Sequence, residues 1–428
     1  MRRSLGILYF LFIVYYLLMM ANGIVIEKGS PVVLGFNILF FAYMVFLNLF
    51  KNPYFNKFLI IYLFLLFLLV LILLTSSAYY ESLRLFVKYA IALLAFPAGF
   101  NLITREKDYH YLMRVAFAFL VLYLLNYIIA STFHLGGSNL RYKGETSVET
   151  GNLFDDALFL NVCILTLLPL MFYFYRKGGK RFVIILMVLV VTVISVICMK
   201  RMVIVCVVLS LVMISLLTRW ISHKYGKLPD SGSVLKLSLP HYALISVALI
   251  VIGVLFWDTF MDQLDARRTE IQRSLEEESR VAEIIAIYED MSEFESDGVS
   301  LLGQETFHTV GTYANGAFGD RMIHTNFGII LNGSGFIGLL FYLVLNLYFL
   351  VVLFRTVRNS VLAENLFARK LYVTYLVLWT VYNVASFSGT IWLTMYPAFN
   401  FLIMGAILRF FYDDKVSNLK SKYERIGL

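Results

Sequence analysis

The 428-residue sequence has little charge, and this shortage limits what the chain can be. Only 15% of its residues are Asp, Glu, Lys or Arg, whereas 60% are hydrophobic. An ordinary soluble domain carries about 25% charged residues, so the composition excludes that class and indicates a protein of the lipid bilayer. The sequence also has no internal repeat, no low-complexity tract and no polar stretch that reads as a soluble catalytic domain. Any chemistry must therefore be built from helix ends and the loops between them.

Cysteine is also scarce, with Cys163, Cys198 and Cys206 all inside apolar runs. Their spacing matches neither a disulfide framework nor a zinc site, so we expect them in the core or facing lipid. The first segment begins with basic residues, as a signal peptide does, but it lacks a small-residue cleavage site. Because its apolar run has about 20 residues, we predict a retained helix.

Long apolar runs are what the sequence has in abundance. A membrane-spanning helix needs about 20 mostly apolar residues to cross the hydrocarbon with every backbone group paired internally. Twelve stretches qualify, approximately 5–24, 32–50, 58–75, 86–103, 112–131, 154–175, 182–199, 202–219, 242–257, 327–354, 371–388 and 392–411. We therefore predict an all-α integral membrane protein of about 12 transmembrane helices, forming one polytopic domain over residues 1–428.

The basic residues predict the orientation of this domain. If the N-terminus is cytoplasmic, the cytoplasmic pieces hold 23 of the 36 Lys and Arg residues and the external pieces hold 12. Because loops rich in Lys and Arg stay inside, we predict that both termini are cytoplasmic.

Two predicted external segments, 132–153 and 258–326, are too long to be simple turns. The first is rich in Gly, Ser and Thr. The second begins with a stretch free of Pro and Gly that predicts one or two helices packed on the membrane domain, with apolar residues at helical spacing: Leu264, Ile271, Leu275, Ala282, Ile285 and Tyr288. Its remainder is Gly-rich and predicts a structured loop.

Several cations are exceptions to the excess of Lys and Arg in the cytoplasmic pieces, because they lie on the predicted external side. They are Lys200 and Arg201 at an outer turn, Arg84 and Lys88 at the outer start of the fourth span, and Arg280 and Arg321 in the long loop. Cationic side chains at helix mouths can bind an anion such as a diphosphate, for which Arg offers a bidentate fork. The alternative is that some of them extend to lipid headgroups or pair locally, as Arg84 could with Glu81. Between Asp258 and Asp320 the long loop holds fifteen acidic residues against four Arg, so an anion would need a local Arg pocket there.

His324 is a second candidate for chemistry, because it lies just before an apolar span. Its ordinary pKa of about 6.5 suits a proton acceptor at neutral pH. Arg321 and Asn326 accompany it, and "NGSGFIG" supplies three glycines that permit close backbone approach: Gly333, Gly335 and Gly338. The alternatives are a histidine that only hydrogen-bonds locally, or a metal site with His308, Asp320 or Glu305, whose irregular spacing disfavours it.

These motifs resemble those of the bacterial O-antigen polymerase and O-antigen ligase superfamily. "HTNFGIILNGSGFIGLLFYL" resembles its His-Asn, aromatic and Gly-x-x-Gly hallmark, and "SRVAEIIAIYEDM" followed by "VSLLGQETF" resembles its Arg-led external helix and glycine loop. "CMKRMVIVCVVLSLVMISLL" resembles its basic outer turn, and "GNLFDDALFLNVCILTLLPL" the start of its sixth span. The resemblance covers roughly residues 150–355.

The resemblance implies a GT-C-like membrane glycosyltransferase of the bacterial cytoplasmic membrane. Such an enzyme transfers an oligosaccharide from undecaprenyl diphosphate to an acceptor sugar at the external face. Arg201, Arg280 and Arg321 would then hold the diphosphate, with Lys200, Arg84 and Lys88 nearby. His324 would be the base or would orient the acceptor, and Asn326 would support it. No cofactor, metal or nucleic acid is expected; membrane lipids, a chain-length regulator and a flippase are the expected partners.

Two departures from the superfamily pattern bear on the reaction. Thr325 separates His324 from Asn326, and Asp155-Asp156 replaces the usual Pro-Asn. Because the His-Asn motif is altered and nothing points to a lipopolysaccharide core, we favour a polymerase over a ligase. A transporter or flippase would more often carry mid-membrane charges and matching halves. A purely structural membrane protein would leave the external Arg and His grouping unexplained.

Overall fold

The computed structural model describes residues 2–21, 31–49, 79–103, 140–142, 146–148, 201–226, 279–293, 325–388 and 396–426, with isolated residues between 70 and 76 and between 108 and 129, and residues 189, 261, 301, 303 and 323. This part of the chain is almost entirely helical. Its helices are α1 (Arg2–Ala21), α2 (Pro31–Leu49), α4 (Tyr79–Leu102), α8 (Arg201–Tyr225), α11 (Ser279–Glu293), α13 (Asn326–Thr356), α14 (Asn359–Glu364), α15 (Leu366–Ser388) and α16 (Tyr396–Ile426).

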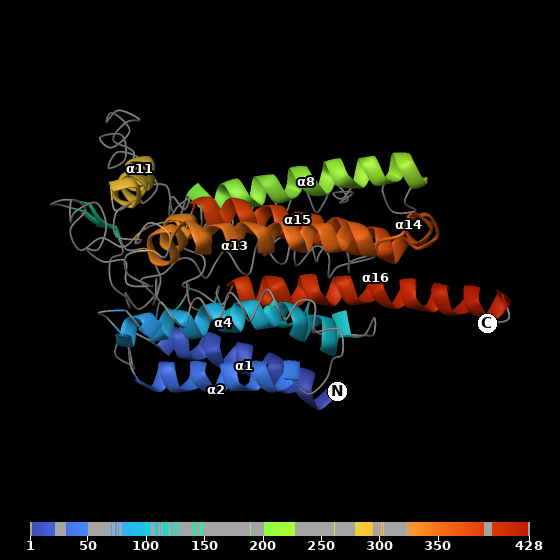
Figure 1. Cartoon of the computed structure of the whole chain (residues 1–428), viewed down its shortest axis with the longest axis horizontal. Coiled ribbons are helices and arrows are strands. Elements are labelled where there is room, and N and C mark those ends of the chain that lie inside the picture. Colours follow the sequence, from blue (N-terminus) through green and yellow to red (C-terminus); the bar gives the residue numbers. More distant parts are fainter. Residues whose placement is uncertain are drawn as a thin grey trace.

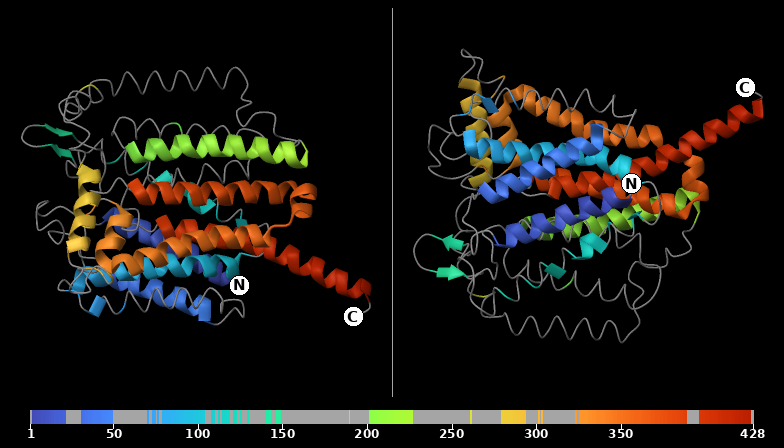
Figure 2. Two further views of the ribbon diagram at one scale, coloured as in Figure 1. Left: turned by 45° about the horizontal axis from the view of Figure 1, so that its top comes forward. Right: turned by 90° about the horizontal axis from the view of Figure 1, so that it is seen from below.

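Four of the described helices are long and apolar enough to cross a membrane. They comprise Pro31–Asn48, Ser82–Leu102, Val205–Tyr225 and Asn326–Thr356. The long helices lie side by side in one bundle, with α11 placed across one end (Figures 1 and 2). The prediction of a helical membrane protein is thus confirmed for the described part, while the predicted spans 58–75, 112–131, 154–175, 182–199 and 242–257 lie mostly or wholly outside it.

Two details differ from the sequence-based expectation. Helix α4 begins at Tyr79 rather than at residue 86, so Arg84 and Lys88 lie inside the helix and not at its start. The segment 132–153 contains an antiparallel hairpin of β1 (Leu140–Tyr142) and β2 (Thr146–Val148), so the protein is not wholly α-helical. Backbone pairing of two short strands depends on the turn between them, for which an apolar periodicity gives no signal.

Both chain ends lie at the end of the bundle opposite α11 and the hairpin (Figure 1). Helix α13 starts beside α11, α15 returns, and α16 runs away from α11 again. The last part of α16 continues past the other helices (Figure 2). The bundle therefore has a polarity, with one end carrying α11 and the other carrying the two termini.

Helix α4 is the centre of the bundle, because 89% of its apolar span is buried. It packs against α2 on one side and α16 on the other. At the α16 crossing the two backbones touch: a Cβ on Gly99 would overlap the carbonyl of Leu402, and one on Gly405 would overlap that of Phe96. Small residues of this kind let membrane helices approach closely.

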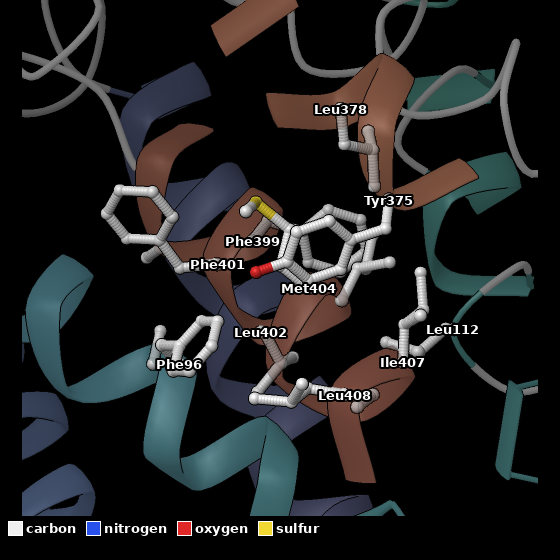
Figure 3. Close-up of a cluster of buried hydrophobic side chains, with 14 of the residues drawn as sticks. Phe96, Leu112, Tyr375, Leu378, Phe399, Phe401, Leu402, Met404, Ile407 and Leu408 are labelled. Carbon is white, nitrogen blue, oxygen red and sulfur yellow. The ribbon is translucent and has the colours of Figure 1, made fainter. Parts of the chain in front are cut away.

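Aromatic and aliphatic side chains fill the space where α4, α15 and α16 meet (Figure 3). The ring of Phe96 stacks on that of Phe349, with centroids 4.4 Å apart, and Phe349 contacts Phe401 at 5.1 Å. Polar groups reinforce this apolar contact, since the Tyr375 hydroxyl donates to the Phe349 carbonyl at 2.8 Å. Such bonds between membrane helices contribute about 1 kcal/mol each.

Arg369 ties together the helix ends at the other end of the bundle. Its guanidinium donates to the carbonyls of Tyr225 at 2.7 Å and Gly226 at 2.9 Å, where α8 ends. It also donates to the carbonyl of Ala363 at 2.6 Å and to that of Leu362, at the end of α14. Because the last carbonyls of a helix lack partners within the helix and carry partial negative charge, this one cation satisfies two helix ends.

The α4–α16 crossing predicts that Gly99→Ala and Gly405→Ala destabilise the protein. Each added methyl group would meet a backbone carbonyl that cannot rotate away, so the helices must separate, at a cost of about 1–3 kcal/mol or more. Gly35→Ala is the matched control, because a Cβ there has nothing within 4 Å. Thermal unfolding of the purified protein in detergent would measure the effect. Equal stability of the Gly99 and Gly35 variants would show that the crossing is not tight.

Candidate functional site

The first turn of α13 begins with a threonine cap. Thr325 has extended backbone dihedral angles, and its Oγ1 accepts a hydrogen bond from the Gly328 amide at 3.0 Å. This bond satisfies one of the amides that a helix start leaves unpaired. The residue that interrupts the His-Asn motif thus has a structural task. Asn326 follows it at the first helical position and is completely buried.

Helix α11 packs on this first turn of α13. Ile287 of α11, Ile323 before the cap and Ile329 within α13 are all buried and form one small apolar cluster with Leu331. A Cβ on Gly328 would lie 2.8 Å from Ile323 Cγ2 and 3.1 Å from Ile287 Cδ1. The prediction that the 258–326 segment contains a helix packed on the membrane domain is therefore confirmed for α11.

Helix α13 is broken at Gly335, its tenth residue. Gly335 has φ 61° and ψ −166°, a conformation outside the helical region that only glycine adopts readily. The backbone of Leu301 and Gly303 lies directly on the break, and a Cβ on Gly303 would lie 2.6 Å from the Gly333 carbonyl carbon. The expected close backbone approach is confirmed at Gly333 and Gly335.

The length of α13 indicates where this break lies in a membrane. Arg355 is in the last turn of the helix, and the residues from Phe336 to Phe354 are almost all apolar. Twenty residues of helix rise about 30 Å, which is the thickness of the hydrocarbon core. If Arg355 lies at one boundary, Gly335 lies at the other. Asn326, Asn332 and Ser334 then belong to the polar layer beyond the hydrocarbon.

The inward face of α11 differs from the prediction. Glu283, Ile287 and Asp290 are buried, with exposures of 0%, 0% and 5%. Ile285 and Tyr288, which were expected to pack on the membrane domain, are 50% and 58% exposed. The prediction was wrong for these two residues, because helical periodicity locates an apolar face without saying what covers it.

The remaining predicted site residues divide into three groups. Arg84 is half-buried and Lys88 is 8% exposed, one turn apart on α4. Arg201 and Arg280 are in the first turns of α8 and α11, and their side chains are outside the described part. Lys200, Arg321 and His324 are themselves outside it.

The fold brings the described parts of this site to a single end of the bundle. Helices α4, α8 and α13 all begin at the end that α11 crosses (Figures 1 and 2). The starts of parallel helices combine their partial positive charges and present unpaired amides. This end therefore combines cations of the sequence with helix starts, an arrangement that suits an anionic group.

Sequence reasoning missed three buried polar residues of this end. Glu283 and Asp290 share a face with Ile287 at helical spacing, and a search for inward-facing charge on that face would have found them. Neither carboxylate is without an interaction partner. Asn332 is completely buried beside the glycine break, and within the described residues neither of its side-chain polar atoms has a hydrogen-bond partner. An unpaired buried amide costs about 1–3 kcal/mol.

Two further findings concern possible metal ligands and similarity to known proteins. Among the residues that the structure describes, no three His, Cys, Asp or Glu side chains are grouped so that they could hold a metal ion. Comparison of the chain with models of known protein families gives no match, and comparison with curated protein sequences gives none either.

Proposed function

We propose that the protein is a membrane glycosyltransferase that polymerises oligosaccharide repeat units carried on undecaprenyl diphosphate. One observation carries the proposal: the Arg280-led helix α11 lies across the bundle end at which α8 begins with Arg201, packed on the start of α13. That start carries the His324-Thr325-Asn326 motif. These three segments are separated in sequence, and all three are among those that resemble the O-antigen polymerase and ligase superfamily.

The cations at this end suit the leaving group of the reaction. When a sugar hydroxyl attacks the anomeric carbon, the bond from that carbon to the diphosphate oxygen breaks, and the lipid diphosphate leaves with added negative charge. Arg201, Arg280 and Arg321 would bind and stabilise it. The starts of α8 and α13 add the partial charge of helix N-termini. Arg84 and Lys88, just inside α4, would extend the positive field.

The attacking hydroxyl must also lose its proton. His324 is our first candidate to accept it, with Asn326 orienting the imidazole or the acceptor. Glu283 is a second candidate, because it is a buried carboxylate one helical turn from Ile287, which contacts the first turn of α13. The two candidates predict different variants to be inactive, and so they can be separated.

The finer assignments follow from the resemblance. We propose a GT-C-like fold of about 12 transmembrane helices, a location in the bacterial cytoplasmic membrane, and the 258–326 loop on the external face. A ligase that transfers glycan to lipopolysaccharide core is the alternative, and it shares the donor site. A flippase or other transporter would use a path between helices rather than a site at one end. Polymer formation by purified protein from lipid-linked repeat units alone distinguishes the polymerase from both.

The orientation can be tested by cysteine labelling in intact cells. A cysteine introduced at Ser296 should react with a membrane-impermeant maleimide, whereas one introduced at Gly178 should react only after the membrane is opened. The expectation rests on the excess of Lys and Arg in the pieces that share a side with the termini. Labelling of Gly178→Cys and protection of Ser296→Cys would reverse the topology.

The diphosphate site predicts that Arg201→Ala and Arg321→Ala abolish polymerisation while the protein remains in the membrane. Arg→Lys should restore activity only in part, because Lys lacks the planar fork. Arg219→Ala is the matched control, since Arg219 is an exposed arginine near the far end of the same helix as Arg201. Polymer length and yield from purified protein are the measurements. Full activity of Arg321→Ala at normal expression would remove Arg321 from the site.

The two candidate bases predict different results for His324→Ala and Glu283→Gln. Loss of the true base should lower turnover by about 10²–10⁴-fold while leaving donor binding nearly unchanged, whereas loss of Arg321 should weaken both. Turnover and binding of the lipid-linked donor are measured separately with purified protein. Normal turnover in both variants would mean that neither side chain accepts the proton.

A further inference from the structure

Helix α11 has an apolar side of which two residues, Ile285 and Tyr288, are exposed. Positions 281, 284, 285, 288 and 291 are Val, Ile, Ile, Tyr and Met, spaced as one side of a helix. Ile285 and Tyr288 on this side are at least half exposed, while the opposite side buries Glu283 and Asp290. A helix on the surface of a soluble protein normally buries its apolar face and exposes its charged residues.

This apolar face continues into the exposed side of α13. The Tyr288 ring meets the Phe336 ring edge-on, with centroids 6.5 Å apart. Phe336 begins a stripe of exposed apolar side chains along α13 that continues through Leu340, Leu343 and Leu347. Leu301, whose backbone lies on the Gly335 break, is 52% exposed as well. One unbroken apolar surface thus runs from the membrane span onto α11.

The depth of the Phe336 ring indicates what covers the α11 face. Phe336 directly follows the glycine break, at the outer edge of the hydrocarbon as judged from the length of α13. Tyr288, in contact with it, then lies at the level of the lipid headgroups, where aromatic residues with a polar tip are enriched. Glu289, at the next position around α11, is exposed too and can remain in water.

We propose that α11 is an interfacial helix seated at the membrane surface, with Ile284, Ile285 and Tyr288 contacting lipid. Its other long side, with Glu283 and Asp290, faces the protein. A helix with an apolar face, a charged face and low overall hydrophobicity is the type that lies in the plane of a membrane surface. The inference rests on exposure and continuity alone and holds whatever reaction the protein catalyses.

This position of α11 at the membrane surface would also place Arg280 at the level of the lipid headgroups. The helix start that carries Arg280 is held at headgroup level from two sides, by lipid on its apolar face and by Ile287 packed on α13. The charged group of any lipid-linked substrate lies at the same level. The membrane itself would thus help to position the cation.

The test compares adjacent positions of α11 in a lipid bilayer. Cys163, Cys198 and Cys206 are replaced by Ala, and single cysteines at Tyr288 and Glu289 are labelled with the fluorophore NBD in nanodiscs. We expect phospholipids with a nitroxide near the headgroup to quench the label of Tyr288→Cys several-fold more strongly than that of Glu289→Cys. Aqueous iodide should give the reverse order. Both positions are exposed, so the substitutions should not disturb folding.

Two results would overturn the proposal. Equal iodide quenching at both positions would place the apolar face in water. A Tyr288→Cys label reached by neither quencher would mean that protein covers the face, and mass measurement of the nanodiscs would then show whether the cover is a second copy of the chain. Ile285→Cys repeats the measurement one turn earlier and should behave as Tyr288→Cys does.

Discussion

Direct contact of backbone with backbone at glycine is the interaction on which the described structure depends. At the α4–α16 crossing, Gly99 and Gly405 bring the central helix against the last one with no side chain between them. The same kind of contact occurs at the α11 end, where Gly303 and Gly335 let the backbone of Leu301 and Gly303 lie on the break in α13. Water does not drive helix association inside a bilayer, so close packing of this kind must supply much of the attraction.

The two ends of the bundle use polar groups in different ways. At the end with the termini, Arg369 donates hydrogen bonds to the last carbonyls of α8 and α14, so its guanidinium has a structural role. At the α11 end α4, α8 and α13 begin, and the first amides of a helix are unpaired and carry partial positive charge. These helix starts are the backbone part of the proposed anion site.

In the proposed arrangement, helix α11 connects the site to the bilayer. Its buried side carries Glu283 and Asp290 together with Ile287, which packs on the start of α13, and its exposed side presents Ile285 and Tyr288. A chain designed for water would bury the second pair and expose the first. The inversion is consistent with a helix that has protein on one side and lipid on the other.

Particular elements show how far the sequence alone could lead. Apolar run length predicted α1, α2 and α13 within a few residues, because a bilayer of fixed thickness demands a fixed length of helix. The glycines of "NGSGFIG" were predicted to permit backbone approach, because that freedom belongs to the residue type. The early start of α4 and the β1–β2 hairpin were not predicted, because polar residues in a helix end or a short strand leave no apolar period to read.

The sequence by itself determined that this chain is helical and apolar enough for a membrane, because composition and the length of apolar runs suffice for that conclusion. The tertiary structure alone decided which backbone lies on Gly335, which side of α11 is inside, and that Asn332 is buried beside the break. Those outcomes depend on contacts between residues far apart in the chain, and a one-dimensional pattern carries the period of a helix face but not the identity of what packs against it.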